Sequence, residues 1–212
     1  MDSPAYFDFV DARSVWGIPN AWNVLSNLPF LLAGGWGLCR LKSVEGKVIS
    51  LGVALTCLGS SLFHWSPNFN TLFWDRLPMA VAFMGILALV IGDRIDLSLG
   101  SRSLPFLVLV GIATVVNWQF GNGDLRPYLL VQYCGLSAVL LIAILIPGGR
   151  LPSRSLIVAF SLYALAKALE SHDGSIFQMT GEIVSGHSLK HLLAALGVGI
   201  LLRRLALLER SI

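Results

Sequence analysis

Charged residues are scarce in this chain. Aspartate, glutamate, lysine and arginine together make up 13% of the 212 residues, whereas a soluble domain has about a quarter of its residues charged. Apolar residues make up 55%, and the mean hydropathy is +0.74. This balance excludes an ordinary soluble globular protein and indicates a chain that meets lipid.

Cysteine is also scarce, since only Cys39, Cys57 and Cys134 are present. All three lie in or at the end of apolar blocks, so neither a disulfide framework nor a thiolate metal motif follows from them. The net charge of +3 does not indicate a nucleic-acid partner. Residues 1–20 lack the apolar run of a cleavable signal peptide, so we expect the first membrane span itself to direct insertion.

Apolar residues are concentrated in blocks of about 17–25 residues, the length that crosses the hydrocarbon core of a bilayer. The blocks predict an all-α integral membrane protein, a bundle of seven transmembrane helices joined by short loops. We expect one domain over residues 1–212, with a short polar segment at 1–19. The predicted spans are roughly 20–41, 47–65, 71–92, 103–119, 126–147, 152–170 and 186–208.

Lysine and arginine are distributed unevenly between the two sides of the predicted bundle. They gather after the first, third and fifth spans and in the C-terminal tail, and they are few in the other loops. The positive-inside rule therefore predicts an N terminus outside and a C terminus in the cytosol. The cations on the cytosolic side are Arg40, Lys42, Lys47, Arg94, Arg102, Arg150, Arg154, Arg203, Arg204 and Arg210.

Histidine is rare, and three of the four histidines stand at the ends of two predicted spans. His64 ends the second span, and His187 and His191 open the last one. His187 and His191 are four residues apart, so they share one face of a helix. The predicted topology puts all three on the non-cytosolic side. Three imidazoles with an open fourth position are typical of a catalytic zinc site, so we expect these residues to bind zinc.

Two further residues could turn a metal site into an active site. Ser60 lies one turn before His64, and Asp75 lies one turn into the third span after a short connection. Asp75 would orient a water molecule or act as a general base, and Ser60 would donate a hydrogen bond to an oxyanion. Each residue also has a structural interpretation: Ser60 as a small packing residue, Asp75 as a partner of Arg76, and a histidine as a hydrogen-bonded core group. Ionisable groups inside spans are costly, which favours a function.

The combined pattern resembles the alkaline ceramidase family, a member of the CREST superfamily of seven-span membrane hydrolases that includes the adiponectin-type receptors. The matching residues are Ser60, His64, Asp75, His187 and His191, with the stretch Trp22–Asn27 in the first span. The resemblance implies a zinc-dependent amidase that splits a membrane lipid such as ceramide into a sphingoid base and a fatty acid. It implies His64, His187 and His191 as zinc ligands, with Ser60 and Asp75 beside the bound water. The short loops are similar to those of a bacterial member, which implies the bacterial inner membrane, with the active site toward the non-cytosolic side.

The same resemblance implies a calcium site in the N-terminal segment. Asp8, Asp11 and Asn20 stand in roughly matching positions and offer the oxygen ligands that Ca²⁺ prefers. However, Arg13 falls where an oxygen ligand is expected, and Asn20 stands in place of a glutamate. An ordinary polar segment, in which Arg13 pairs with Asp8 or Asp11, is therefore an equal alternative.

Other polar residues in the predicted spans have open roles. Asn23, Ser26 and Asn27 either support the ligand histidines or form interhelical hydrogen bonds, and the second interpretation is favoured for at least two of them. A second group either lines a polar cavity for a lipid headgroup or forms a structural ion-pair network, with a slight preference for the network. Its members are Asp124, Arg126, Gln132, Lys167, Glu170, His172, Asp173 and Lys190.

Two other classes of protein remain as alternatives. A receptor-like or sensory protein would hold a fatty acid in a pocket, and four protein ligands would close its zinc shell. A transporter would have helices interrupted at the bilayer midplane, but the clustering of polar groups on one side argues against it. The sequence does not indicate an oligomeric state.

Overall fold

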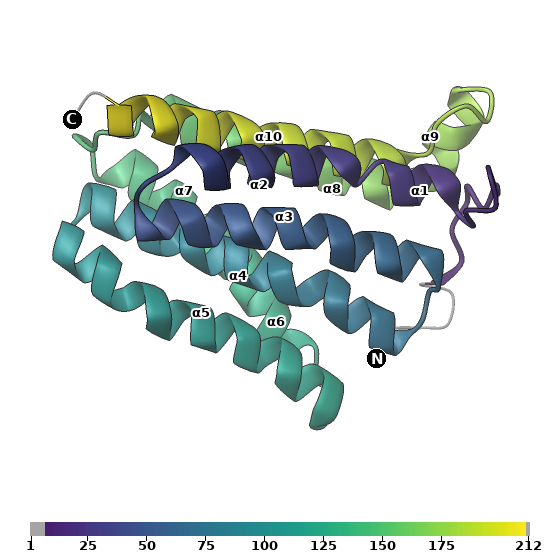
Figure 1. Cartoon of the computed structure of the whole chain (residues 1–212), viewed down its shortest axis with the longest axis horizontal. Helices are drawn as coiled ribbons and strands as arrows, with labels where there is room; N and C mark the ends of the chain where they lie inside the picture. The colour runs from purple at the N-terminus through teal and green to yellow at the C-terminus, as the bar shows by residue number, and fades with distance from the viewer. Residues whose placement is uncertain (1–6, 211–212) are drawn as a thin grey trace.

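The chain folds into one bundle of helices in a computed structural model that describes residues 7–210. Figure 1 shows the long helices running back and forth along one axis, with α2 and α10 side by side along one edge and α5 along the other. The described residues contain no β-strand beyond an isolated bridge between Val15 and Ile18. The elements are α1 (Ala21–Leu25), α2 (Leu28–Arg40), α3 (Val44–Trp65), α4 (Phe69–Arg94), α5 (Leu97–Phe120), α6 (Arg126–Leu129), the π-helix η2 (Leu130–Cys134), α7 (Gly135–Leu145), α8 (Ser153–Ser171), α9 (Asp173–Met179) and α10 (Gly186–Arg210).

Five helical stretches are long and apolar enough to cross a membrane. They are α3, α4, α5, α10 and the continuous run Arg126–Leu145, which joins α6, η2 and α7. The prediction of an all-helical, multi-pass protein is confirmed to this extent. The other two predicted spans lack this character, because α2 has only 13 residues and because α8 carries Arg154, Lys167 and Glu170 within its 19 residues.

The first predicted span, residues 20–41, is divided into two helices at Ser26 and Asn27. Both side chains donate hydrogen bonds to the Asn23 carbonyl, over 3.1 Å from Ser26 Oγ and 2.9 Å from Asn27 Nδ2. Pro29 follows at the start of α2, where its missing amide hydrogen costs nothing. Polar side chains that compete for backbone groups interrupt helices in this way. The interruption leaves Ser26 buried and in contact with α10.

Helices α3 and α4 are antiparallel neighbours, as the short connection between them predicts. Asn68 Oδ1 accepts hydrogen bonds from the amides of Asn70 and Thr71, and Thr71 Oγ1 accepts one from the Asn68 amide. This reciprocal cap fixes the start of α4. One turn further on, Gly59 of α3 lies against the backbone of α4, where a Cβ atom would come within 2.0 Å of the Trp74 carbonyl oxygen. Close backbone packing of this kind is typical of helices in membranes.

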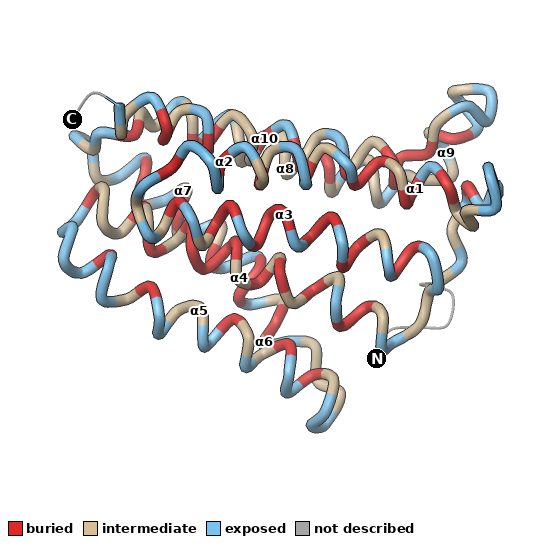
Figure 2. The backbone as a smooth tube through the Cα atoms, in the orientation of Figure 1, coloured by how far each residue is buried: buried red, intermediate tan, exposed pale blue. Residues whose placement is uncertain are grey.

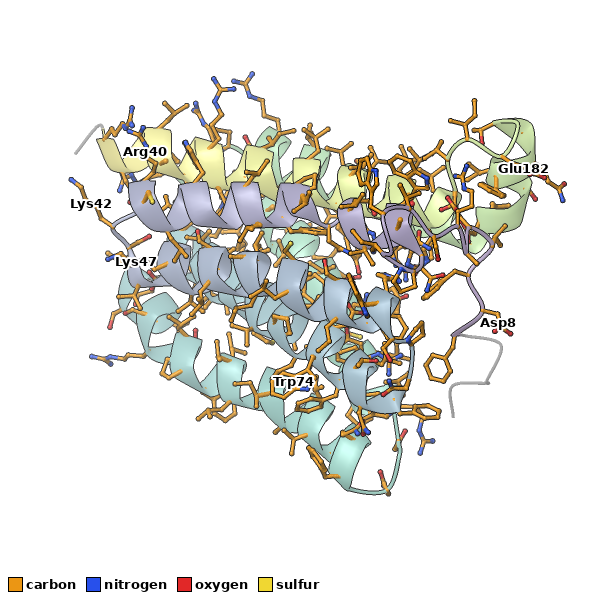
Figure 3. All side chains as sticks on the ribbon, turned by 45° about the vertical axis from the view of Figure 1, so that its right-hand side comes forward. Asp8, Arg40, Lys42, Lys47, Trp74 and Glu182 are labelled. Atoms are coloured by element: carbon orange, nitrogen blue, oxygen red, sulfur yellow. The ribbon has the colours of Figure 1, made fainter. Side chains whose placement is uncertain are left out.

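Burial differs from one helix to the next, whereas charged residues are distributed along the length of the bundle. Figure 2 shows that α3 and α4 carry buried residues along most of their length, whereas α5 is largely exposed or partly buried. The cations around the connection between α2 and α3 instead gather at one end of the long axis. Figure 3 places Arg40, Lys42 and Lys47 at one end of the bundle and Asp8 and Glu182 at the other.

Candidate metal centre

Three histidines meet at one end of the bundle, opposite the end that carries Arg40, Lys42 and Lys47, here called the cation end. His64 lies in the last turn of α3, and His187 and His191 lie in the first two turns of α10. All three are buried, and their ligand atoms lie within 4.8 Å of one another. No other group of three histidine, cysteine or carboxylate residues among residues 7–210 is arranged to hold a metal ion. The prediction that these histidines come together is confirmed.

The spacing of two of these rings fits the coordination sphere of one metal ion. His64 Nε2 and His187 Nε2 are 3.2 Å apart. Two nitrogens that each lie 2.0–2.1 Å from a tetrahedral zinc ion are about 3.3–3.4 Å apart. The rings of His64 and His191 and those of His187 and His191 have their centroids 5.0 Å apart. The three side chains could therefore hold a metal ion with small side-chain adjustments.

A serine in the helix interruption contacts one of the candidate ligands. Ser26 Oγ is 2.8 Å from His191 Nδ1 and donates its own hydrogen to the Asn23 carbonyl, 3.1 Å away. With the hydroxyl in this direction, its oxygen can accept from His191 Nδ1–H, and Nε2 of the ring is then the available ligand atom. Hydrogen bonds of this kind fix the tautomer of metal-binding histidines. Of the three polar residues flagged in the first span, Ser26 supports a ligand directly.

The other two polar residues of the first span have structural roles. Asn23 Oδ1 accepts a hydrogen bond from Ser188 Oγ over 2.9 Å, and Asn27 donates to the Asn23 carbonyl. Asp173 Oδ1 accepts from the His187 amide over 2.7 Å and so caps the start of α10. Neither the role of Ser188 nor that of Asp173 as a cap was anticipated from the sequence. Ser188 directly follows His187, which was its only signal, whereas Asp173 is 14 residues away and had none.

Ser60 and Asp75 lie beside each other near the histidines. Ser60 is buried, Asp75 is partly buried, and the Ser60 hydroxyl donates a hydrogen bond to the Asp75 carboxylate. Gly59 makes this contact possible, because it lets the Trp74–Asp75 backbone approach α3. The guanidinium of Arg76 stacks over the Trp118 ring at 4.3 Å. Both Ser60 and Asp75 line the same cavity as His191.

The cavity has a volume of about 340 Å³, with a polar end and an apolar end. Ser60, Asp75 and His191 form part of the polar end, and Leu156 and Leu201 lie in the apolar part. Leu201 is ten residues after His191 on α10, which corresponds to about 15 Å along a helix. The apolar lining also includes Phe30, Val53, Ala82, Phe83, Ile86, Val139 and Val198. The cavity therefore extends from the candidate metal site into the middle of the bundle.

An ion-pair network of α8 and α10 lines the polar end of the cavity. The two oxygens of Glu170 accept from Lys167 and from Lys190, the second over 2.7 Å. Lys190 Nζ is also 3.0 Å from His187 Nε2. This ammonium donates to the lone pair that a metal ion would take, so metal binding requires the flexible Lys190 side chain to release His187. Lys167, Glu170 and Lys190 both pair with one another and line the cavity. The two interpretations from the sequence, a polar cavity lining and an ion-pair network, are therefore compatible.

The π-helical segment η2 was not anticipated from the sequence. It lies within the fifth predicted span and contains Gln132, which is buried and donates a hydrogen bond to the Tyr163 hydroxyl. Both residues line the cavity. Single π-helical turns are frequent at functional sites because they redirect side chains. No signal in the sequence marks this local change of period.

The N-terminal segment covers the histidine cluster. The Phe9 ring lies 4.6 Å from the ring of His64 and 5.2 Å from that of His187, measured between centroids. Asn20 Nδ2 donates to the His64 carbonyl over 2.9 Å. The Phe9 ring therefore packs against two of the three candidate ligands. The sequence did not indicate this role for Phe9.

Arg13 forms an ion pair with Asp11, one of the three predicted calcium ligands. Its guanidinium donates to both oxygens of the buried Asp11, each over 2.7 Å, and this hydrogen bond raises the pKa of Arg13. Asp8 is exposed, and the Asn20 amide group faces His64 as described above. The structure therefore has the ion pair that the sequence left as an alternative. Calcium binding by Asp8, Asp11 and Asn20 stays a prediction.

Two other polar groups lie apart from the histidines. His172 is exposed, and its Nδ1 is 2.9 Å from the Ala168 carbonyl oxygen, in agreement with its exclusion from the motif. Arg126 forms a bidentate pair with Asp124, and its hydrogen bonds lower the pKa of Asp124. Neither group lines the cavity.

Comparison with known proteins adds no relative. No protein-family model matches the chain, and no curated protein matches it significantly. The functional argument therefore depends on the residues and geometry of this chain.

Proposed function

We propose that the chain is a seven-span membrane hydrolase that uses zinc to cleave the amide bond of a lipid such as ceramide. The observation that carries the proposal is a cluster of three histidines, of which His191 lines a largely apolar cavity together with Ser60 and Asp75. Each residue type has a known part in metal-assisted hydrolysis. The resemblance to alkaline ceramidases supplies the reaction class.

The ligand set supports a catalytic site over a structural one. In the part of the chain that the structure describes, the group of potential ligands has three members, His64, His187 and His191. A receptor with a structural zinc shell would need a fourth protein ligand. Zinc held by three imidazoles supplies a water molecule that is activated as a nucleophile near neutral pH.

Ser60 and Asp75 supply the remaining groups of the reaction. Asp75 accepts a proton from the attacking water and passes it to the leaving amine, as a general base and then a general acid. Ser60 turns its hydroxyl from Asp75 toward the substrate carbonyl and stabilises the negative charge that develops on its oxygen. The cover provided by Phe9 keeps water out, which strengthens these interactions.

The shape and setting of the cavity suit a lipid. A fatty acyl chain would lie along the apolar part toward Leu201, with its carbonyl at the histidines. We place the histidine end on the non-cytosolic side, because Arg40, Lys42 and Lys47 lie at the opposite end. On this assignment α1–α2 and α8 complete seven spans. The substrate then enters from the membrane.

Metal analysis and lipid hydrolysis of the purified chain test the proposal. We expect one zinc ion per chain and release of fatty acid from an N-acyl sphingosine. His64→Ala should lose both, because it removes a ligand from the centre of the cluster. His172→Ala is the matched control, since this exposed histidine lies outside the cluster, and it should retain both. A His64→Ala variant with full zinc content and full activity would contradict the proposal.

A further inference from the structure

The cavity has more positive than negative charge beside the histidines. Its lining includes three cations, Arg76, Lys167 and Lys190, and two carboxylates, Asp75 and Glu170. Glu170 alone pairs with both lysines. An excess charge in surroundings of low dielectric constant is costly unless a counter-ion meets it. A ligand that brings a negative charge would therefore be stabilised at this end of the cavity.

Metal binding would increase this demand for an anion. An ammonium group has three donor hydrogens, and the acceptors of Lys190 among the described residues are Glu170 and the ring nitrogen of His187. A metal ion on His187 takes the lone pair that Lys190 now contacts. Lys190 would then keep one acceptor, the Glu170 carboxylate that it shares with Lys167, and it would lie near the metal cation. The loss of the His187 acceptor and the added positive charge both favour a further, negatively charged acceptor.

The polar strip along α8 gives such a ligand group a defined place. Tyr163, Lys167 and Glu170 are spaced by four and three residues, so they share one face of α8, and all three line the cavity. Gln132 extends the strip through its hydrogen bond to Tyr163. Lys190 connects the strip to the histidine cluster. An anionic group near the scissile amide can therefore contact the lysines while the acyl chain lies in the apolar part.

We propose that Lys167 and Lys190 bind an anionic group, a carboxylate or a phosphate, on the amine side of the lipid. The preferred substrates are then anionic N-acyl amines, and neutral ceramide is a poorer ligand. This inference rests on the proposed function, because it assumes an amide-linked acyl chain in the cavity. It assigns the Lys167–Glu170–Lys190 cluster a role in binding and selecting the substrate.

Equilibrium binding to the metal-free protein tests the inference without turnover. The probes are N-palmitoylglycine, N-palmitoylethanolamine and the phosphate ester of N-palmitoylethanolamine, which share an acyl amide and differ in charge. Titration calorimetry in a zwitterionic detergent should give at least one anionic probe an affinity about tenfold higher than that of the neutral probe. Preference for the glycine probe alone indicates a carboxylate ligand, and preference for the phosphate ester alone indicates a phospholipid headgroup. Equal affinities for all three probes, or no binding of any, would overturn the inference.

Variants separate charge recognition from a merely structural ion-pair network. Lys167→Met should abolish the preference, whereas Lys167→Arg, which keeps the charge, should retain it. Glu170→Gln should retain or increase it, because it removes the competing carboxylate. Lys42→Met, at the opposite end of the bundle, is the matched control and should change nothing. A preference that survives Lys167→Met would overturn the inference. Loss of hydrolysis or of zinc binding leaves these affinities measurable, so failure of the proposed function is recognised separately.

Discussion

The two ends of the bundle differ in how they are built. At the histidine end, the first helix is interrupted, an aromatic segment covers the cluster, and polar side chains bond to one another across helices. Toward the cation end, α2, α3, α4 and α10 run without interruption around an apolar core that includes Ile49, Val90 and Leu202. Hydrogen bonds occur in both regions, but they have different targets. At the cation end, Arg94 donates to the Ile146 and Leu151 carbonyls and so joins helix ends to loops, whereas at the histidine end the bonds reach the candidate ligands themselves. Buried polar networks fix side chains at the cost of desolvation, which is expected where chemistry requires exact positions.

The largest effect should come from a change that keeps the shape of the histidine end but removes its proton acceptor. Asp75→Asn is nearly isosteric and leaves the three histidines in place. We expect amide hydrolysis to fall by roughly 10²–10⁴-fold with zinc content unchanged. Fatty-acid release and metal analysis measure the two quantities. If activity persisted, or if zinc were lost with it, Asp75 would not have the role of a general base.

The next effect tests whether the hydrogen-bond network, and not the ligands alone, defines the metal site. Ser26→Ala removes the partner of His191 Nδ1, so the ring is no longer held in one tautomer. We expect zinc affinity to fall by roughly 10–100-fold, measured by competition with a chelator. Ser61→Ala is the control, because Ser61 bonds to the Val24 carbonyl and to Cys57, away from His191. Equal affinities of the two variants would show that the network does not tune the site.

The sequence predicted the features of the site that depend on residue spacing along a helix, and it missed those that depend on tertiary contacts. The four-residue spacing of His187 and His191, and the short turn before Asp75, determine which helix faces meet. The interruption at Ser26, the cover by Phe9 and the π-helix at Gln132 depend on tertiary contacts that no local pattern encodes. The charges of α8 illustrate the same limit. Lys167 and Glu170 lower the hydropathy of this helix, and only the structure shows that both line the cavity.

Close helix packing near the histidine end gives the third prediction. A Cβ atom at Gly59 would lie 2.0 Å from the Trp74 carbonyl oxygen, whereas at Gly35 of α2 it would meet nothing within 4 Å. Gly59→Ala should therefore separate α3 from α4 and destabilise the fold by about 1–3 kcal/mol. The midpoint of thermal unfolding in detergent measures this, with Gly35→Ala as the matched control. Equal midpoints for the two variants would contradict the close approach that brings Asp75 to Ser60.

The smallest effect should come from an ion pair outside both the hydrogen bonds of the histidine cluster and the Lys167–Glu170–Lys190 cluster. Asp124 and Arg126 are bonded to each other at the exposed start of α6, and the pKa of Asp124 is lowered. A carboxylate with a lowered pKa contributes stability above its unfolded pKa and loses it as the pH falls through its folded pKa. Asp124→Asn should thus leave the unfolding midpoint unchanged at neutral pH within error, because exposed pairs contribute little, and slightly reduce its decline in acid. A large loss at neutral pH would show that this surface pair, and not only the partly buried Lys167–Glu170–Lys190 cluster, supports the histidine end.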